Sequence, residues 1–350
     1  MSYRCHVALS QNFGNLAYLT SLELNGCNLA SLPDSFGQLT ALNRLSLHHS
    51  KALQLPDSFT ELSSLAVLEC RRCSILPPSP VDFGQLGALE TIILVEVRGM
   101  RDLVADLEHL QRLKTLLING CSDITTLPVS LPRLPALTEL ALDMGEISVL
   151  PEDFGQLSTL RKLVLNLRSF AALPDSIALV TTLQELSLDH LLNLTHLPQE
   201  FGQLVLLEKL YLKDLRQLTH LPETFGQLIS LRELKLLECR QLQQLPDSLS
   251  QLSSLEHLEF NDCPCLTVLP DDMGKGLRSL RHLHLLECTA LTHLPPSFSA
   301  LTSLETLKIV DAKRFRGALL DGFGCLKSLK ELSLESMPRF SSLPCFILWR

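Results

Sequence analysis

One pattern of leucines recurs along almost the whole chain, and it constrains the fold more than any other feature. The block LxxLxLxx, in which x is any residue, begins every 23 to 25 residues, at Leu19, Leu42, Leu65, Leu89, Leu113, Leu137, Leu160, Leu183, Leu207, Leu231, Leu255, Leu280, Leu304 and Leu329. Self-similarity at such a period is the signature of a repeat array, in which each unit contacts only its neighbours. We therefore predict a single repeat domain over residues 1–350, with about 14 repeats, a partial repeat at 1–18 and an incomplete repeat at 338–350.

Each block predicts a short β-strand. In one unit, the fourth and sixth residues, Leu234 and Leu236, point to one face, while Glu233, Lys235 and Leu237 point to the other. Because one unit is too small to bury its leucines alone, the units must stack. The predicted fold class is an α/β repeat solenoid, a horseshoe with one parallel sheet on its concave face and short helical turns or loops on its convex face.

A second recurring segment, LPxxFGQL, predicts the turn on the outer face. Leu-Pro ends the strand side, because proline lacks the donor that would continue a ladder. Proline at the first position and a carboxylate beside it suit one helical turn. We expect a glycine to stop that turn in these units, at Gly37, Gly84, Gly155, Gly202 and Gly226.

The repeat is irregular at three places and incomplete at both ends. Residues 78–80 insert a Pro-Ser-Pro segment, which predicts a small loop, and the Leu-Pro pair fails at residues 318–319. After Asp102, leucines at helical spacing predict a helix of two to three turns: Leu103, Leu107, Leu110 and Leu113. Neither end shows a polar capping element, which favours a piece of a longer polypeptide over a degenerate cap.

Composition and charge disfavour several classes of partner. The net charge of −8 argues against nucleic acid and anionic membranes. No apolar run reaches the roughly 18 residues of a membrane span, and the N-terminal residues lack the apolar core of a signal peptide. These features predict a cytoplasmic protein that binds neither nucleic acid nor membrane.

The cysteines follow the repeat as well. The chain has 11 of them, and six fall at one repeat position: Cys27, Cys73, Cys121, Cys239, Cys263 and Cys288. An odd total and a single repeat position indicate small buried residues, not a disulfide framework. We therefore predict reduced, buried thiols.

Equivalent residues of successive repeats become columns on the predicted sheet, with neighbours about 4.8 Å apart. The fifth-position column is apolar in four consecutive repeats, from Ile93 to Val164, although this position should face away from the core. A contiguous exposed apolar patch usually marks an interaction site. We predict a partner-binding patch of Ile93, Val95, Leu117, Met144, Val164 and Leu167. The alternative is that another part of a longer chain, or the loop at 78–80, covers it.

The eighth-position column is acidic in five successive repeats, from Asp214 to Asp311. Stacked like charges repel, and we expect Lys213, Lys235 and Lys308 to offset part of the cost. One interpretation is a solvated rim, and the other is a surface for a basic partner. With neighbouring fifth-position residues, the predicted charged stripe comprises Tyr211, Asp214, Lys235, Glu238, Asp262, His284, Glu287 and Asp311.

Residues with catalytic or metal-binding potential are sparse. His257, His282 and His284 fall on neighbouring strands beside Glu259, and such a group can bind zinc or sense pH, but no spacing fixes a tetrahedral site. The glycine of FGQL recurs with the repeat, so it indicates no phosphate-binding loop. No GxSxG or HExxH motif occurs. We predict no catalytic residue, no metal, no cofactor and no enzymatic activity.

The repeat resembles the leucine-rich repeat. The units LPDSFGQLTALNRLSL (32–47) and LPETFGQLISLRELKLLEC (221–239) look most like the array at the C-terminus of plant nucleotide-binding disease-resistance receptors, with its LPxxIGxLxxLxxLxLxxC units. Phenylalanine stands here where that array has isoleucine. The resemblance implies recognition of pathogen effectors and autoinhibition of a nucleotide-binding module. No Walker motif of such a module occurs in this chain.

Three functions are open from the sequence. The first is an immune-receptor recognition array that binds a protein ligand on its concave face, with the missing nucleotide-binding module of a longer chain as one candidate ligand. The second is a free-standing signalling scaffold of the intracellular Ras group, whose LPxxFGxLxxLxxL units look similar. The third is an enzyme with a site on the concave face. Flanking sequence would separate the first two, and an activity screen would address the third.

Overall fold

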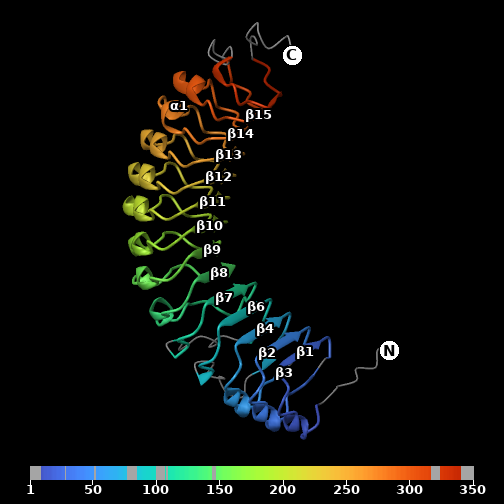
Figure 1. The fold of residues 1–350 in the computed structure, drawn as a ribbon. Helices are drawn as coiled ribbons and strands as arrows, with labels where there is room; N and C mark the ends of the chain where they lie inside the picture. Colours follow the sequence, from blue (N-terminus) through green and yellow to red (C-terminus); the bar gives the residue numbers. More distant parts are fainter. Residues whose placement is uncertain are drawn as a thin grey trace, which may run out of the picture. The chain divides into compact units, whose positions relative to one another are not determined.

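The computed structural model describes residues 9–27, 29–50, 53–76, 85–99, 107, 109–143, 147–316 and 324–339. The chain divides into two compact units, Met1–Arg168 and Ser169–Arg350, which are described separately. In each unit the strands lie along one side and the helical turns along the other (Figure 1). The single domain expected over residues 1–350 stays a prediction.

The first unit contains seven parallel strands that follow one another in sequence order. They are β1 (Ser21–Asn25), β2 (Arg44–His48), β4 (Val67–Arg71), β6 (Thr91–Val95), β7 (Thr115–Asn119), β8 (Glu139–Asp143) and β9 (Lys162–Asn166). Each strand covers the third to seventh residues of a block, and equivalent residues pair, as Leu116 does with Leu140. A two-stranded parallel sheet pairs β3 (Leu53–Gln54) with β5 (Ile75–Leu76).

The second unit repeats this arrangement with seven more parallel strands. They are β10 (Glu185–Asp189), β11 (Lys209–Lys213), β12 (Glu233–Leu237), β13 (His257–Asn261), β14 (His282–Leu286), β15 (Thr306–Val310) and β16 (Glu331–Glu335). The register again joins equivalent residues, as in Leu234 with Leu258. The predicted fold class, a repeat solenoid with parallel strands on one face and short turns on the other, is confirmed.

The core of each unit is built from the leucines that define the repeat. The side chains of the first, fourth and sixth block residues point inward, and Leu137, Leu140 and Leu142 are each 0% exposed. The alternating residues of the same strands are half-buried on the opposite face. Side chains of a strand alternate between faces, so the leucine spacing alone determines which residues remain available to a ligand.

Short helical turns form the outer face. They are η1 (Phe13–Asn15), η2 (Asp34–Gln38), η3 (Asp57–Glu61), η5 (Leu131–Arg133), η6 (Phe154–Gln156), η7 (Asp175–Leu179), η8 (Gln199–Gln203), η9 (Glu223–Gln227), η10 (Asp247–Gln251), α1 (Met273–Gly276) and η11 (Pro296–Ala300). All but α1 are 3₁₀ helices. Proline is the residue that caps η9, Pro222, and is not its first residue as predicted. It still ends the extended segment, because its own backbone is in the extended region.

The glycine of FGQL has a different role from the predicted one. Gly226 lies inside η9, which ends at Gln227 with Leu228 as its C-cap, so this glycine does not stop the helix. A Cβ on Gly226 would lie 2.2 Å from the carbonyl oxygen of Ser248, and one on Gly202 would lie 2.0 Å from that of Thr224. Glycine is therefore needed here because the turns of neighbouring repeats approach too closely for any side chain. The equivalent Gly84 lies outside the described residues.

Phenylalanine side chains form a regular row beneath the turns. Phe13, Phe36 and Phe59 stack with ring centroids 6.1 and 6.2 Å apart, and Phe201 stacks on Phe225 at 6.2 Å. The planes within each pair differ by only 4°. Among these five, all but Phe13 are fully buried. The ring position of LPxxFGQL thus supplies the outer half of the core, as leucine supplies the strand half.

The predicted helix after Asp102 is wrong in the part that can be tested. Residues 101–106 and 108 lie outside the described residues, but residues 109–113 form a turn. Leu107, Leu110 and Leu113 are nevertheless buried, at 0–1% exposure. Their spacing reflects core positions of the repeat, which happen to coincide with helical spacing. The irregular segments at 78–80 and 318–319, and the chain ends at 1–8 and 340–350, lie outside the described residues.

The repeat-position thiols are largely buried. Cys73, Cys121, Cys239, Cys263 and Cys288 are at most 2% exposed, whereas Cys27 in the first repeat is half-buried. All nine cysteines that the structure describes are free. Cys239 Sγ donates to Leu212 O at 3.6 Å and Cys263 Sγ to Leu236 O at 3.5 Å. Burial raises the pKa of the Cys73 and Cys121 thiols, so they stay protonated and unreactive.

Candidate functional site

The predicted apolar patch lies on the strand face of the first unit. Ile93 on β6 pairs with Leu117 on β7, Leu117 with Ala141 on β8, and Ala141 with Val164 on β9. All four side chains, and Val95 beside Ile93, are half-buried. The residue that precedes them in the same column is Glu69. The patch is therefore a continuous apolar stretch on a face that also carries ionised side chains.

Two members of the predicted patch are not on that surface. Leu167 is 0% exposed, so its placement on the strand face is wrong. The repeat that begins at Leu160 is one residue shorter than most others, and the deletion turns Leu167 into the core. Met144 lies outside the described residues. The observable patch is Ile93, Val95, Leu117, Ala141 and Val164, which we call the apolar column.

An ion-paired cluster joins two strands of the second unit. The Tyr211 hydroxyl on β11 donates to Glu233 Oε2 at 2.8 Å, and Lys235 Nζ on β12 lies 2.8 Å from Glu233 Oε1. Lys235 Nζ also lies 5.5 Å from the centre of the Tyr211 ring. Burial and the Glu233 bond raise the pKa of Tyr211. Although burial opposes it, bonds from Lys235 and Tyr211 lower the pKa of Glu233, which favours its carboxylate form.

Three histidines lie beside this cluster. The His257 ring on β13 stacks on the His282 ring on β14, with centroids 4.4 Å apart and planes 9° apart. The next column pairs Glu259 with His284. Burial lowers the pKa of both His282 and His284, and the nearby His257 adds to the effect at His282. Within the described part of the chain, no group of three or more His, Cys, Asp or Glu residues is placed to hold a metal ion.

The acidic column marks the place where each strand ends. Backbone φ is positive at the eighth position of twelve repeats: Gly26, His49, Arg72, Glu96, Gly120, His190, Asp214, Glu238, Asp262, Glu287, Asp311 and Ser336. The N–H of this residue donates to a carbonyl of the next repeat, as Glu238 does to Asn261 O at 2.7 Å. The column therefore consists of left-handed turn residues. The sequence pattern identified the column but not this conformation.

The three lysines expected to offset the acidic column pair elsewhere. They bond to third- or seventh-position carboxylates, Lys213 to Asp189 at 3.8 Å, Lys235 to Glu233 at 2.8 Å and Lys308 to Glu331 at 2.9 Å. A lysine on the strand face reaches its neighbours on that face before it reaches the turn. This part of the prediction is wrong.

Arginines neutralise two of the five acids, one from the same repeat as its acid and one from the preceding repeat. Arg216 Nε lies 2.7 Å from Asp214 Oδ1, and Arg240 Nη2 lies 2.7 Å from Asp262 Oδ2. Asp214 is only 2% exposed, so it belongs to the interior of the turn and cannot meet a partner directly. Glu238, Glu287 and Asp311 are not buried, and none of the three has an ion pair among the described residues. The charged stripe is thus narrower than predicted.

A third column of the strand face was not predicted from the sequence. At the seventh position, most described strands carry polar residues such as Asn119, Lys213 and Asn261. Four are aliphatic: Val95 in the first unit, which belongs to the apolar column, and Leu237, Leu286 and Val310 in the second unit. The three in the second unit are half-buried on the strand face. The same column comparison that revealed the apolar column would have found them, because an aliphatic residue at a solvent-facing position stands out against its neighbours.

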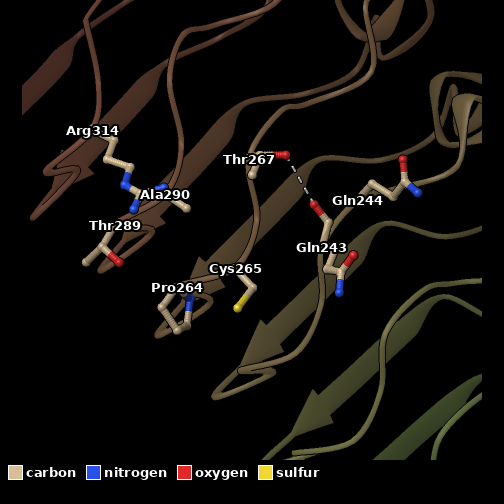
Figure 2. A pocket seen from close by; sticks show the side chains of 8 residues that line it. All are labelled: Gln243, Gln244, Pro264, Cys265, Thr267, Thr289, Ala290 and Arg314. Atoms are coloured by element: carbon tan, nitrogen blue, oxygen red, sulfur yellow. Dashed lines mark hydrogen bonds between the residues drawn. The ribbon is translucent and has the colours of Figure 1, made fainter.

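An open pocket of about 550 Å³ lies beyond the strand ends of the second unit (Figure 2). It is lined by the loops after β12 to β15, namely by Gln243, Gln244, Pro264, Cys265, Thr267, Thr289, Ala290 and Arg314. Thr267 Oγ1 donates to Gln243 O at 3.5 Å across adjacent loops. Arg314 supplies the one charged side chain among these lining residues. The pocket has no acid–base pair and indicates no catalytic chemistry.

The repeat and its parallel strands together have the features of the leucine-rich repeat fold. Residues 3–123 match the model of the leucine-rich repeat region. Compared with curated protein sequences, the chain has no match. No helix of the described residues is long and apolar enough to cross a membrane.

Three solved structures show the same fold. A leucine-rich repeat protein of Leptospira interrogans is 22% identical with a TM-score of 0.61, over 93% of this chain and 92% of that one. Internalin InlF of Listeria monocytogenes is 19% identical with a TM-score of 0.57, over 96% and 88%. The ectodomain of the plant receptor kinase GASSHO1/SCHENGEN3 of Arabidopsis thaliana, solved in complex with CASPARIAN STRIP INTEGRITY FACTOR 2, is 24% identical with a TM-score of 0.54, over 96% and 46%. At these identities the likeness concerns the fold alone.

Proposed function

We propose that the chain is a protein-recognition module whose strand face, the concave face of the predicted horseshoe, binds a protein ligand. The apolar column carries this proposal. The fifth position is solvent-facing and carries serine, glutamate, lysine or histidine in most other repeats, so the fold does not require aliphatic residues there. Four of them in register on neighbouring strands offer apolar area to a partner.

We further propose that the module is the ligand-sensing and autoinhibitory region of a plant immune receptor-like protein that acts in the cytoplasm. The LPxxFGQL and LxxLxLxxC units support this role through their resemblance to those receptors. A nucleotide-binding module of a longer chain is then one candidate ligand. The GASSHO1 ectodomain, with the same fold, has been solved in complex with another molecule, which supports ligand binding by this architecture.

A free-standing signalling scaffold is the second candidate. The observation that favours it is the phenylalanine row, because phenylalanine is the residue that Ras-group units carry where the plant receptors carry isoleucine. An enzymatic role has no comparable support, since the leucine-rich repeat fold is typically a binding scaffold. A nucleotide-binding domain encoded upstream of Met1 would support the receptor function, and its absence there would support the scaffold function.

Substitution on the apolar column tests the recognition proposal. A library of displayed proteins is selected on the wild-type chain, and each binder is then measured on Leu117→Asp/Val164→Asp. We expect loss of binding with little change in unfolding free energy, because substitutions on a surface usually change stability by about 0.5 kcal/mol or less. Ser187→Asp, at the same column position outside the patch, is the matched control. Leu140→Ala should instead destabilise by about 2–5 kcal/mol, because it leaves a cavity.

Two outcomes would count against the proposal. If the double variant unfolds, the two side chains belong to the core and the strand register is misread. If it folds and binds every selected protein as the wild type does, the apolar column is incidental. The Ser187→Asp control separates a specific effect from a general effect of added negative charge on the strand face.

A further inference from the structure

The strand face of the second unit carries a second set of aliphatic side chains, separate from the apolar column. Leu237 on β12, Leu286 on β14 and Val310 on β15 occupy the seventh position, and we call them the aliphatic ridge. In register, Leu237 pairs with Asn261, Asn261 with Leu286, and Leu286 with Val310. The position accepts asparagine within the ridge itself, so packing does not demand aliphatic residues there.

Negative charge runs along one side of the ridge. Each ridge residue is followed directly by an acid in a left-handed turn, Glu238, Glu287 or Asp311, and none of these three acids is buried. No lysine, arginine or histidine of the described chain lies within 4.0 Å of these three carboxylates. Asp262, the acid after Asn261, is the exception, because Arg240 binds it. The acids without an ion pair thus coincide with the aliphatic residues.

We propose that the aliphatic ridge and its flanking acids bind a basic amphipathic α-helix of a protein partner. The occupant must offer apolar side chains to the ridge and lysine or arginine to Glu238, Glu287 and Asp311. Charge complementarity of this kind selects the partner and accelerates encounter. The inference rests on the proposed function only in that it takes the strand face to be a protein-binding surface.

The spacing of the ridge favours a helix over an extended segment. With strands about 4.8 Å apart, Leu286 and Val310 lie roughly 9.6 and 14.4 Å along the column from Leu237. In an α-helix, residues i, i+7 and i+10 lie about 0, 10.5 and 15 Å along the axis, within one apolar stripe. An extended segment offers one-sided side chains only at multiples of roughly 6.7 Å, so it misses Leu286 by about 3 Å.

The test uses a synthetic peptide of stated design. A labelled 20-residue helix carries leucine at positions 5, 12 and 15 and lysine along one flank of that stripe. A second peptide has the same composition and net charge, but its leucines are moved off the stripe. Fluorescence anisotropy measures the Kd of each peptide for the full chain. We expect the striped peptide to bind and the shuffled peptide to bind at least about tenfold more weakly, a difference of one decade in Kd.

Substitutions in the chain locate the binding site. Leu237→Asn and Leu286→Asn copy the residue found naturally at Asn261, so both variants are expected to fold, which circular dichroism checks. Each variant should raise the Kd of the striped peptide about tenfold. Ile229→Asn makes the same kind of change at an exposed residue just after η9, away from the strand face, and it should leave the Kd within about twofold. Glu238→Gln with Glu287→Gln should reduce the salt dependence of binding.

Three results would overturn the inference: no binding of the striped peptide up to about 1 mM, equal binding of the shuffled peptide, or an unchanged Kd in both ridge variants. Equal binding of the shuffled peptide would mean that charge attraction alone holds the peptide, without contacts to the aliphatic ridge. These outcomes are distinguishable from failure of the proposed function, which depends on Leu117 and Val164. If those two substitutions abolish partner binding while the striped peptide does not bind, only the helix inference fails.

Discussion

Replacing Gly226 with alanine tests whether the outer turns of neighbouring repeats are in direct contact. The new Cβ would lie 2.2 Å from Ser248 O and 2.8 Å from Ser248 Cβ. An ordinary contact begins at 3.4 Å, so the two turns must separate by roughly 1 Å. The obstacle on the Ser248 side is a backbone oxygen, which cannot rotate away as a flexible side-chain end can.

The expected loss of stability combines three contributions. Overpacking in a close-packed interior costs about 1–3 kcal/mol. Separation of the turns also weakens the bond from Gly226 N to Ser248 Oγ, which is 3.3 Å long and contributes about 0.5–1.5 kcal/mol. Alanine also stabilises the folded state by about 0.4–1 kcal/mol relative to glycine, because it reduces the conformational freedom of the unfolded chain, and this gain offsets part of the loss. We expect a net loss of about 1–3 kcal/mol in unfolding free energy.

Urea unfolding followed by circular dichroism measures the change, with Gly87→Ala as the matched control. A Cβ on Gly87 meets no atom within 4 Å, so alanine there should leave stability unchanged or raise it by up to about 1 kcal/mol. Amide exchange should become faster in η9 and η10 of Gly226→Ala if the damage is local. Equal stability of Gly226→Ala and wild type would refute the close approach of the turns.

Three further predictions concern the turns, the thiols and the histidines. Glu238→Gly should raise stability by up to about 1 kcal/mol and Glu238→Val should lower it, because φ is +58° and only glycine adopts that region freely; unfolding free energies that change alike in both variants would contradict this. Cys239 is 0% exposed, so native labelling of this thiol should be slow and labelling after denaturation rapid, and prompt native labelling would be the adverse result. Burial lowers the pKa of His282 and His284 below the unfolded value of about 6.5. As the pH falls, the unfolded chain therefore binds more protons than the folded chain, and stability decreases from about pH 6.5 down to the folded-state pKa. The variant His282→Gln/His284→Gln should therefore lose less unfolding free energy than wild type between about pH 7.5 and about pH 5.5, and an equal loss would assign the effect to other groups.

One strand per block could be predicted because the positions of these strands follow the leucine spacing, whereas β3 and β5 lie outside the blocks and were not predicted. Buried leucines at the fourth and sixth positions of a block leave one register for the strand between them. For this reason the column that joins Ile93 to Val164 appeared in the structure as expected. The same arithmetic failed at Leu167, where the deletion of one residue moves a side chain from the face to the core.

The chemistry of the columns was harder to predict, because it depends on conformations that residue identity does not reveal. Glycine at positions 26 and 120 is consistent with a positive φ at the eighth position of the block. Glutamate and aspartate occupy the same position in other repeats and rarely adopt positive φ, so the sequence did not predict this conformation. Burial of Asp214 follows from its bonds to Arg216, and the sequence shows only that the two residues are near neighbours. The roles of the apolar column and of the charged stripe as binding surfaces stay predictions.

The repeats whose turns carry stacked phenylalanine rings are wedge-shaped. Their ring centroids are 6.1–6.2 Å apart on the outer side, whereas adjacent strands are about 4.8 Å apart, so these repeats are wider outside by roughly 1.4 Å. Smaller side chains occupy the ring position in some units, at Ile177 and Leu249, which makes the wedge angle a local variable. The radius at which a strand face meets its ligand can therefore change through residues that the ligand never touches.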